Sequence, residues 1–272
     1  MSEPLVIKLG GELLADHEQC RALASDVAQL CAQRRVVVVH GGGPQATALS
    51  KSLGLSAKKV GGRRITDRDT LEVMKMVLGG QVNIDLCAMF HGFGLPAVGL
   101  SGSSAGLVQA VKRPPRAVSG SDGELVDFGY VGDITSINTS LLNTLCDAGY
   151  VPVMNSLGID PAGQVYNINA DVAATRVAAA LSAKLVMSTG GVRGVLRELD
   201  DPNSRFTVLS PEQARAAIAE GVIAGGMIPK VEEGLGALAL GVVSVHIVGC
   251  LQPGDLLAEL NEAGSVGTAL QG

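Results

Sequence analysis

The stretch VVVVHGGGP, residues Val36 to Pro44, decides the fold of this chain. Four consecutive valines favour a strand buried on both faces, which is typical of a parallel sheet. Three glycines follow, and Pro44 suits the first turn of the helix that the next residues predict. A strand, a glycine turn and a helix start together present free backbone N–H groups and the positive end of a helix dipole. The stretch therefore predicts an anion-binding turn, although a tight turn without a ligand would use the same residues.

A second stretch, LVIKLGG from Leu5 to Gly11, repeats the pattern of a buried strand that ends in glycines. Residues 17–33 predict a helix, so the first forty residues form a strand–helix–strand unit. Ligands of parallel sheets gather at the carboxyl ends of the strands. Lys8 lies within the first strand, where an unpaired ammonium is costly. It either extends to solvent at the strand end or meets a bound anion.

Composition excludes several classes of protein. The chain has 272 residues, 47% of them apolar, and a net charge of −5 without a basic block, which argues against a nucleic-acid partner. Its five cysteines are scattered and form no CxxC pair, as expected of reduced thiols in a cytoplasmic protein. We find no signal peptide and expect no apolar run long enough to span a membrane.

Two nucleotide-binding motifs are also excluded. The chain has no GxxxxGK[ST] motif. Gly41-x-Gly43-x-x-Ala46 fits the loose dinucleotide fingerprint, but that fingerprint needs an acidic residue about 20 positions further on. The chain is basic there, from Lys58 to Arg64.

That basic stretch, KKVGGRRIT, predicts a hairpin with its turn at Gly61 and Gly62, followed by a helix that Thr66 caps. Arg63 and Arg64 are either a solvated edge or the source of a guanidinium fork for a substrate carboxylate. Further along the chain, short hairpins and then a helix from Ser136 are expected.

The second half carries two more polar sites. In YNINAD, Asn169 predicts a helix N-cap and Asp171 suits the first turn, but capping leaves Asn167 unexplained. In GGMIPK, Pro229 predicts a helix start, which places Lys230 where the helix dipole disfavours a cation. Lys230 therefore either pairs with a nearby glutamate or faces a bound anion.

Two lysines, two glycine turns, one aspartate and a basic hairpin together indicate phosphoryl transfer, where catalysis is mostly positioning and charge neutralisation. At this point the chain resembles the amino-acid kinases. Five motifs carry the resemblance in order, namely VIKLGGELL, VVVHGGGP, GGRRITD, YNINADVAA and GGMIPKVE, and it extends from Leu5 to the final GTAL.

The resemblance implies an α/β fold: an open, mostly parallel eight-stranded sheet sandwiched by helices, in two lobes. Residues 1–166 would form the N-terminal lobe, which binds the acylamino acid and dimerises, and residues 167–272 the C-terminal lobe, which binds ATP with Mg²⁺. The implied reaction transfers the γ-phosphoryl group of ATP to the side-chain carboxylate of N-acetyl-L-glutamate, in arginine biosynthesis.

The resemblance also implies the site residues. Lys8 and Lys230 would flank the transferring phosphoryl group, and Asp171 would hold both lysines. Arg64 and Asn167 would bind the acceptor. Backbone groups of six glycines would complete the acceptor and phosphate sites: Gly42 and Gly43 for the acceptor, and Gly10, Gly11, Gly190 and Gly226 for the nucleotide. Gly191 stands where the family usually has an aspartate, which affects the nucleotide site.

Two alternatives stay open. The acceptor could be an N-acylated aminoadipate of lysine biosynthesis, one methylene longer, since one methylene discriminates by only about 1–3 kcal/mol. The chain could also be a catalytically dead amino-acid-binding regulatory module.

Arginine-inhibited members of the family carry an extra N-terminal helix that links dimers into a hexamer. Because the first strand begins near Leu5, we expect a homodimer that arginine inhibits weakly or not at all.

Overall fold

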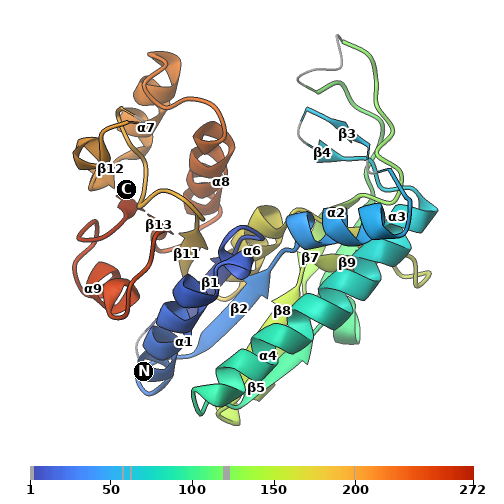
Figure 1. The fold of residues 1–272 in the computed structure, drawn as a ribbon, viewed down its shortest axis with the longest axis horizontal. Helices are drawn as coiled ribbons and strands as arrows, with labels where there is room; N and C mark the ends of the chain where they lie inside the picture. Colours follow the sequence, from blue (N-terminus) through green and yellow to red (C-terminus); the bar gives the residue numbers. More distant parts are fainter. Residues whose placement is uncertain (1–2, 57, 62, 119–122, 199) are drawn as a thin grey trace.

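The computed structural model describes residues 3–56, 58–61, 63–118, 123–198 and 200–272. Figure 1 shows an α/β molecule in which helices cover both faces of a central sheet. The helices are α1 (His17–Cys31), α2 (Gly43–Ser52), α3 (Arg68–Met74), α4 (Asn83–Gly92), α5 (Ser140–Asp147), α6 (Ala170–Ala180), α7 (Pro211–Ala219), α8 (Met227–Ala239) and α9 (Asp255–Asn261), with 3-10 turns η1 (Leu13–Ala15), η3 (Ser104–Gly106) and η4 (Pro202–Ser204) and the π-helix η2 (Lys75–Val82). The strands are β1 (Leu5–Leu9), β2 (Val36–His40), β3 (Lys59–Val60), β4 (Arg63–Arg64), β5 (Ala97–Leu100), β6 (Val108–Lys112), β7 (Gly132–Ile137), β8 (Val151–Asn155), β9 (Leu157–Ile159), β10 (Val165–Asn167), β11 (Lys184–Ser188), β12 (Val208–Leu209), β13 (Val245–Val248) and β14 (Thr268–Leu270).

The central sheet confirms the predicted fold class. Its eight strands follow the order β12-β14-β13-β11-β1-β2-β8-β5. The pairings from β13 through β11, β1, β2 and β8 to β5 are all parallel, whereas β14 runs antiparallel to β13. Strands β1 and β2 lie side by side at the centre, and every residue of both is buried. The apolar runs that predicted them are therefore long because both faces are covered.

Two apolar layers flank the sheet, one on each face, and successive side chains of β1 point alternately into one layer and the other. Leu5, Ile7 and Leu9 pack with α1, α4 and α9 on one face. Val6 packs with α6 and α8 on the other face. Because side chains alternate along a strand, Lys8 points to the same face as Val6, toward α6.

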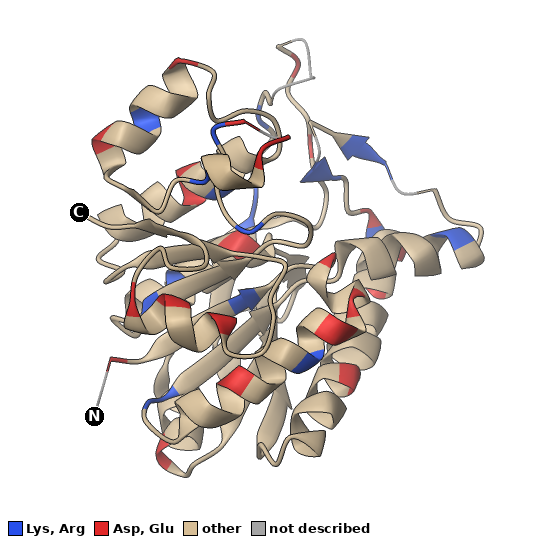
Figure 2. Cartoon of the chain, turned by 60° about the vertical axis from the view of Figure 1, so that its left-hand side comes forward, with Lys and Arg blue, Asp and Glu red and all other residues tan. Residues whose placement is uncertain are grey.

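A smaller sheet and a hairpin lie beside the carboxyl ends of the central strands. The smaller sheet has the order β10-β9-β6-β7, and β3 pairs with β4 in a separate hairpin. In Figure 2 this hairpin forms a basic pair of strands that stands away from the central sheet. Gly61, with φ of 54°, occupies its turn, and Gly62 lies outside the described residues.

Two predicted helix starts are wrong. Asp67, not Thr66, caps α3, and its carboxylate accepts the Thr70 N–H. Thr66 is buried because its backbone pairs with the chain near Phe128 instead. The helix expected from Ser136 begins only at Ser140, because β7 continues to residue 137 and pairs there with β6.

Helices α3, η2 and α4 form one continuous segment, Arg68–Gly92, of 25 residues. By length and hydropathy this segment could cross a membrane, so the expectation that no apolar run is long enough was wrong. One such helix is weak support for a membrane span, because a core helix passes the same test. The face that carries Val77, Leu78 and Phe90 is buried in the apolar layer over the central sheet.

Candidate functional site

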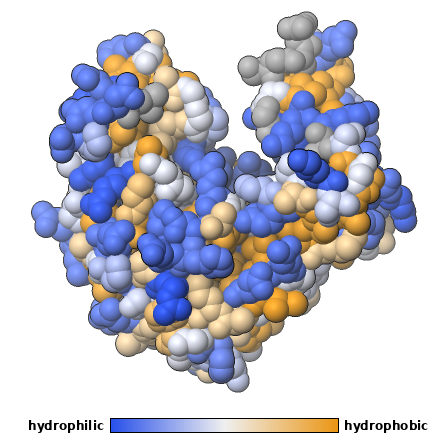
Figure 3. Space-filling view, in the orientation of Figure 1, coloured by the Kyte–Doolittle hydropathy of each residue, from blue (hydrophilic) through white to orange (hydrophobic). Residues whose placement is uncertain are grey.

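A cavity of about 530 Å³ lies at the carboxyl ends of β1, β2 and β11. Its lining residues come from both glycine turns, the basic hairpin, the start of α6 and the start of α8. Figure 3 shows the opening as a cleft between two parts of the molecule. The position agrees with the rule that parallel sheets bind ligands at their carboxyl edge.

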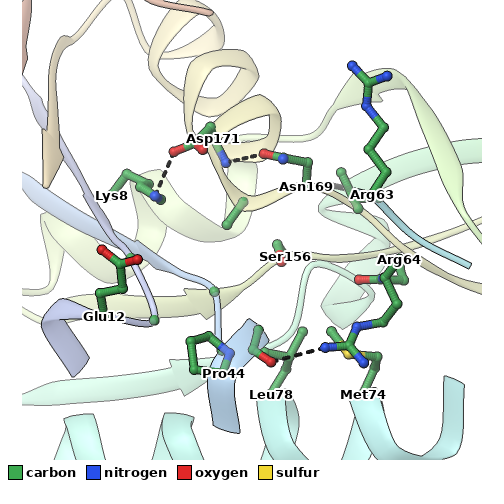
Figure 4. A pocket seen from close by; sticks show the side chains of 18 of the residues that line it. Lys8, Glu12, Pro44, Arg63, Arg64, Met74, Leu78, Ser156, Asn169 and Asp171 are labelled. Atoms are coloured by element: carbon green, nitrogen blue, oxygen red, sulfur yellow. Dashed lines mark hydrogen bonds and ion pairs between the residues drawn. The ribbon is translucent and has the colours of Figure 1, made fainter. Parts of the chain in front are cut away.

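Lys8 and Asp171 form an ion pair at the base of this cavity (Figure 4). The Lys8 ammonium lies 2.6 Å from the Asp171 carboxylate, and only 5% of the Lys8 residue is exposed. Asp171 is held by its place in the first turn of α6, where Asn169 accepts its backbone N–H at 2.7 Å. Asn169 therefore caps α6 as expected, and Asp171 lies in the first turn of that helix and also pairs with Lys8.

Lys230 joins this pair from α8. Burial, followed by the charge of Lys8, lowers the pKa of the Lys230 ammonium. Burial works to raise the pKa of Asp171, but the charges of Lys8 and Lys230 outweigh it and the pKa is lowered. Lysine and arginine side chains outnumber the carboxylates of Glu12 and Asp171 among the described residues that line the cavity, which leaves an excess of positive charge there. Such an arrangement is suited to a polyanionic ligand.

The two glycine turns lie against each other at the edge of the cavity, where Gln45 Nε2 donates to Gly11 O at 3.0 Å. A Cβ on Gly11 would lie 2.4 Å from Pro44 Cδ, and one on Gly42 would lie 2.8 Å from Leu78 Cδ2, so neither position has room for a side chain. Among the residues that the structure describes, the backbone N–H groups of Gly11, Gly42 and Gly43 donate to no protein acceptor. These three N–H groups are available to a bound anion.

Arg64 and Asn167 line the side of the cavity toward the small sheet. Arg64 Nη2 donates to Gly43 O at 3.0 Å and to Thr47 Oγ1 at 2.7 Å, while its Nη1 is buried without a protein partner. Asn167 Nδ2 donates to Thr66 Oγ1 at 3.1 Å. An unpartnered guanidinium nitrogen beside a cavity favours a carboxylate ligand there.

The two arginines of the hairpin differ in direction. In Figure 4 the side chain of Arg64 turns toward Pro44, whereas that of Arg63 extends away from it. Arg63 is exposed and Arg64 is only partly so. The hairpin residues alone left open which arginine would face the site, the resemblance implied Arg64, and the geometry favours Arg64.

The glycines expected to bind the nucleotide lie further apart along the chain than those of the two glycine turns. Gly10 and Gly190 line the cavity, and the Gly10 N–H donates to Ser188 Oγ at 3.1 Å. Gly226 stands at the N-cap of α8, directly before the segment that carries Lys230. Gly191 is exposed, and a Cβ there would meet nothing within 4 Å.

Sequence reasoning missed several lining residues, namely Glu12, Ser188, Thr189 and Arg113. The first three follow directly after β1 or end β11, so the strand-end rule that selected the glycines would have found them too. Arg113 had no such signal, because it comes from a hairpin region without a motif. Its guanidinium is paired with Asp133 at 2.6 Å. Within the described part of the chain, no group of three or more His, Cys, Asp or Glu side chains could hold a metal ion.

Comparison with known proteins gives one consistent family. The model of the amino acid kinase family matches residues 3–249. The acetylglutamate kinase of Sorangium cellulosum (strain So ce56) is 50% identical, over 98% of this chain and 94% of the relative. That of Anaeromyxobacter dehalogenans (strain 2CP-C) is 48% identical, over 98% of this chain and 99% of the relative.

Solved structures agree on the fold. The N-acetylglutamate synthase of Neisseria gonorrhoeae, complexed with coenzyme A and N-acetyl-glutamate, matches with a TM-score of 0.78 at 28% identity, over 99% of this chain and 59% of that one. The carbamate kinase of Giardia lamblia bound to AMP-PNP matches with a TM-score of 0.65 at 18% identity, over 99% and 98%. At that identity the likeness concerns the fold alone.

Proposed function

Because this chain belongs to the amino acid kinase family, we propose that it is an acetylglutamate kinase, which phosphorylates the side-chain carboxylate of N-acetyl-L-glutamate with ATP. The observation that carries the proposal is the cluster of Lys8, Asp171 and Lys230 opposite two glycine turns with free N–H groups. The product would be an acyl phosphate for arginine biosynthesis.

The proposed reaction is an in-line displacement. A carboxylate oxygen of the acceptor forms a bond to the γ-phosphorus of ATP, and the bond from that phosphorus to the β,γ-bridging oxygen breaks, so ADP leaves with the electron pair. No proton moves, because the carboxylate is already ionised. Lys8 and Lys230 would stabilise the charge that spreads over the transferring group, and Asp171 would hold the two ammonium groups in place.

We propose that the free N–H groups of Gly11, Gly42 and Gly43 bind the transferring phosphoryl group and the reacting carboxylate. Arg64 would bind the α-carboxylate of the acceptor through its unpartnered Nη1, and Asn167 would contact the acetamido end. The phosphates of the nucleotide would lie along Gly10, Gly190 and Gly226, which follow the carboxyl ends of β1 and β11 or precede α8.

The residues fit a magnesium ion that the nucleotide carries. Of the described residues that line the cavity, only Glu12 and Asp171 have carboxylates, and Asp171 is paired with Lys8. Glu12 is therefore the carboxylate that would approach such an ion, directly or through water. When bound, the ion would neutralise charge on the β- and γ-phosphates.

We further propose a cytoplasmic homodimer with an acceptor lobe (residues 1–166) and a nucleotide lobe (residues 167–272). The exposed apolar side chains of Met76 and Ile84 support a partner on the long helix, since they are 53% and 64% exposed. Figure 3 shows apolar surface over the same helix. The five free cysteines suit a reducing compartment.

A coupled assay of ADP release would test the function. The purified chain is supplied with ATP, Mg²⁺ and one of N-acetylglutamate, N-acetylaminoadipate, glutamate or aspartate. We expect the highest kcat/KM with N-acetylglutamate. Preference for N-acetylaminoadipate would reassign the acceptor, and no ADP release with any of the four would contradict a kinase.

A further inference from the structure

A buried polar chain lies behind the glycine turn that follows β2. His40 ends β2 and is fully buried. Its Nδ1 lies 2.9 Å from Gly41 O, and its Nε2 lies 2.9 Å from Asn83 Nδ2. Asn83, at the start of α4, also donates to Val153 O at 2.9 Å.

The partners fix the proton on the imidazole. A backbone carbonyl only accepts, so His40 Nδ1 must carry the hydrogen that reaches Gly41 O. The Asn83 amide is oriented by Val153 O, which likewise only accepts, so its nitrogen donates to His40 Nε2. Burial lowers the pKa of His40 to about 4, which keeps the ring neutral near neutral pH. His40 is therefore the Nδ1–H tautomer.

This tautomer determines which way the peptide between Gly41 and Gly42 faces. The described chain contains no cis peptide, and in a trans peptide the C=O and the following N–H point in opposite directions. His40 draws Gly41 O toward the layer of α4. The Gly42 N–H therefore points to the opposite face, the side on which Lys8 and Asp171 lie.

Glycine makes such control necessary. Two neighbouring glycines have access to most of backbone space, so their peptide can rotate with little steric cost. If it turned over, Gly41 O would replace the Gly42 N–H at the cavity and would repel an incoming anion. The fixed donor on His40 opposes that rotation.

We propose that His40 and Asn83 are positioning residues for phosphoryl transfer, which hold the Gly41–Gly42 peptide so that the Gly42 N–H faces the transferring group. The inference rests on the proposed function. Neither side chain lines the cavity, so both act through the backbone.

Two substitutions of His40 separate the two halves of the chain of hydrogen bonds. His40→Asn keeps an amide N–H near the position of Nδ1 and loses the acceptor for Asn83. His40→Gln keeps an acceptor near the position of Nε2 and loses the donor to Gly41 O. Both leave a smaller or reshaped core, so both lower the melting temperature.

We expect His40→Gln to reduce kcat about tenfold to a hundredfold, somewhat less than the loss of one preorganised donor, with an unchanged KM for ATP. His40→Asn should keep most of kcat. A fall in kcat that follows the fall in melting temperature equally in both variants would overturn the proposal, because it would reflect packing alone.

A second measurement does not depend on activity, and its main result comes from the wild-type chain. Long-range ¹H–¹⁵N NMR of the wild-type chain should show His40 as the Nδ1–H tautomer at neutral pH, and Asn83→Leu should allow the Nε2–H form to appear. An Nε2–H tautomer in the wild type would overturn the proposal. Absence of kinase activity with a Nδ1–H ring would contradict the proposed function and leave the hydrogen-bond assignment intact.

Discussion

Replacing Lys8 with methionine tests the centre of the proposed site. Methionine has nearly the length of lysine and keeps the strand apolar, so the change removes the ammonium and little else. The structure places this ammonium 2.6 Å from Asp171, in a residue that is only 5% exposed. The ammonium is therefore held rigidly, and the free energy of orienting it is spent during folding rather than during the reaction.

The expected magnitude follows from that geometry. Loss of one preorganised donor to the transition state costs about 3–4 kcal/mol, which is roughly 10²–10³ in kcat. Removing one partner of a buried ion pair costs about 3–5 kcal/mol of stability. Lys230 still compensates Asp171, whose side chain is 22% exposed, so the loss of stability should fall at or below the lower end of that range.

The assay compares kcat and KM of Lys8→Met, Asp171→Asn and the double variant. If Lys8 and Asp171 act as a unit, the double variant is scarcely slower than Lys8→Met alone. Lys184→Met is a matched control, because Lys184 lies on the neighbouring strand β11 and pairs with Glu3 at the surface at 3.6 Å. A kcat of Lys8→Met close to that of the wild type, or an equal loss in Lys184→Met, would refute a catalytic role.

Three other predictions concern binding, pH and stability. Arg64→Lys should raise the KM for the acylamino acid much more than the KM for ATP, because an ammonium lacks the guanidinium fork, and Arg63→Lys should do far less; equal effects would show that the wrong arginine was chosen. The kcat of the wild type should fall as pH rises, at a pH below the ordinary lysine pKa of 10.5, because the pKa of Lys230 is lowered. Lys230→Arg should move this fall to higher pH, because a guanidinium stays protonated. If the substitution leaves the fall unchanged, another group is responsible for it. Glu259→Gln should lower the free energy of unfolding by about 3 kcal/mol at pH 7, measured by urea denaturation. Burial works to raise the pKa of Glu259, but its hydrogen bonds outweigh burial and lower it. Its contribution is therefore present above the unfolded value of 4.5 and is lost as pH falls through the lower folded value, so a difference that persists in strong acid would contradict the assignment.

The pattern of the central strands predicted a parallel α/β sheet, and the resemblance to the amino-acid kinases supplied its eight strands. Uninterrupted apolar runs such as Val36–Val39 suit only strands covered on both faces, and the glycines mark the ends of those strands. The reversal of β14 and the smaller sheet could not be predicted, because strand pairing depends on tertiary contacts that local sequence does not record. Thr66 illustrates the same limit: its residue type suits a cap, but its backbone pairs with a distant segment and leaves the cap to Asp67.

Some residues of the candidate site could be predicted from the sequence and others could not. Lys8 and Lys230 were selected because each would be costly in its local position without an anion, and that reasoning needs no knowledge of contacts. Arg113 was missed because it is locally unremarkable and reaches the cavity only through the hairpin that carries it.

His40 lies between these cases. A histidine at the end of a strand suits a role at the following glycine turn, but the same sequence also suits a buried core histidine. Only the distances to Gly41 O and Asn83 Nδ2 separate the two readings, since together they fix the tautomer and hence the direction of the Gly42 N–H. A glycine turn supplies the freedom to approach an anion, and that freedom is useful only if a neighbouring side chain limits it. In this chain the residue before the three glycines provides the limit, so the proposed anion-binding motif includes the histidine as well as the glycines.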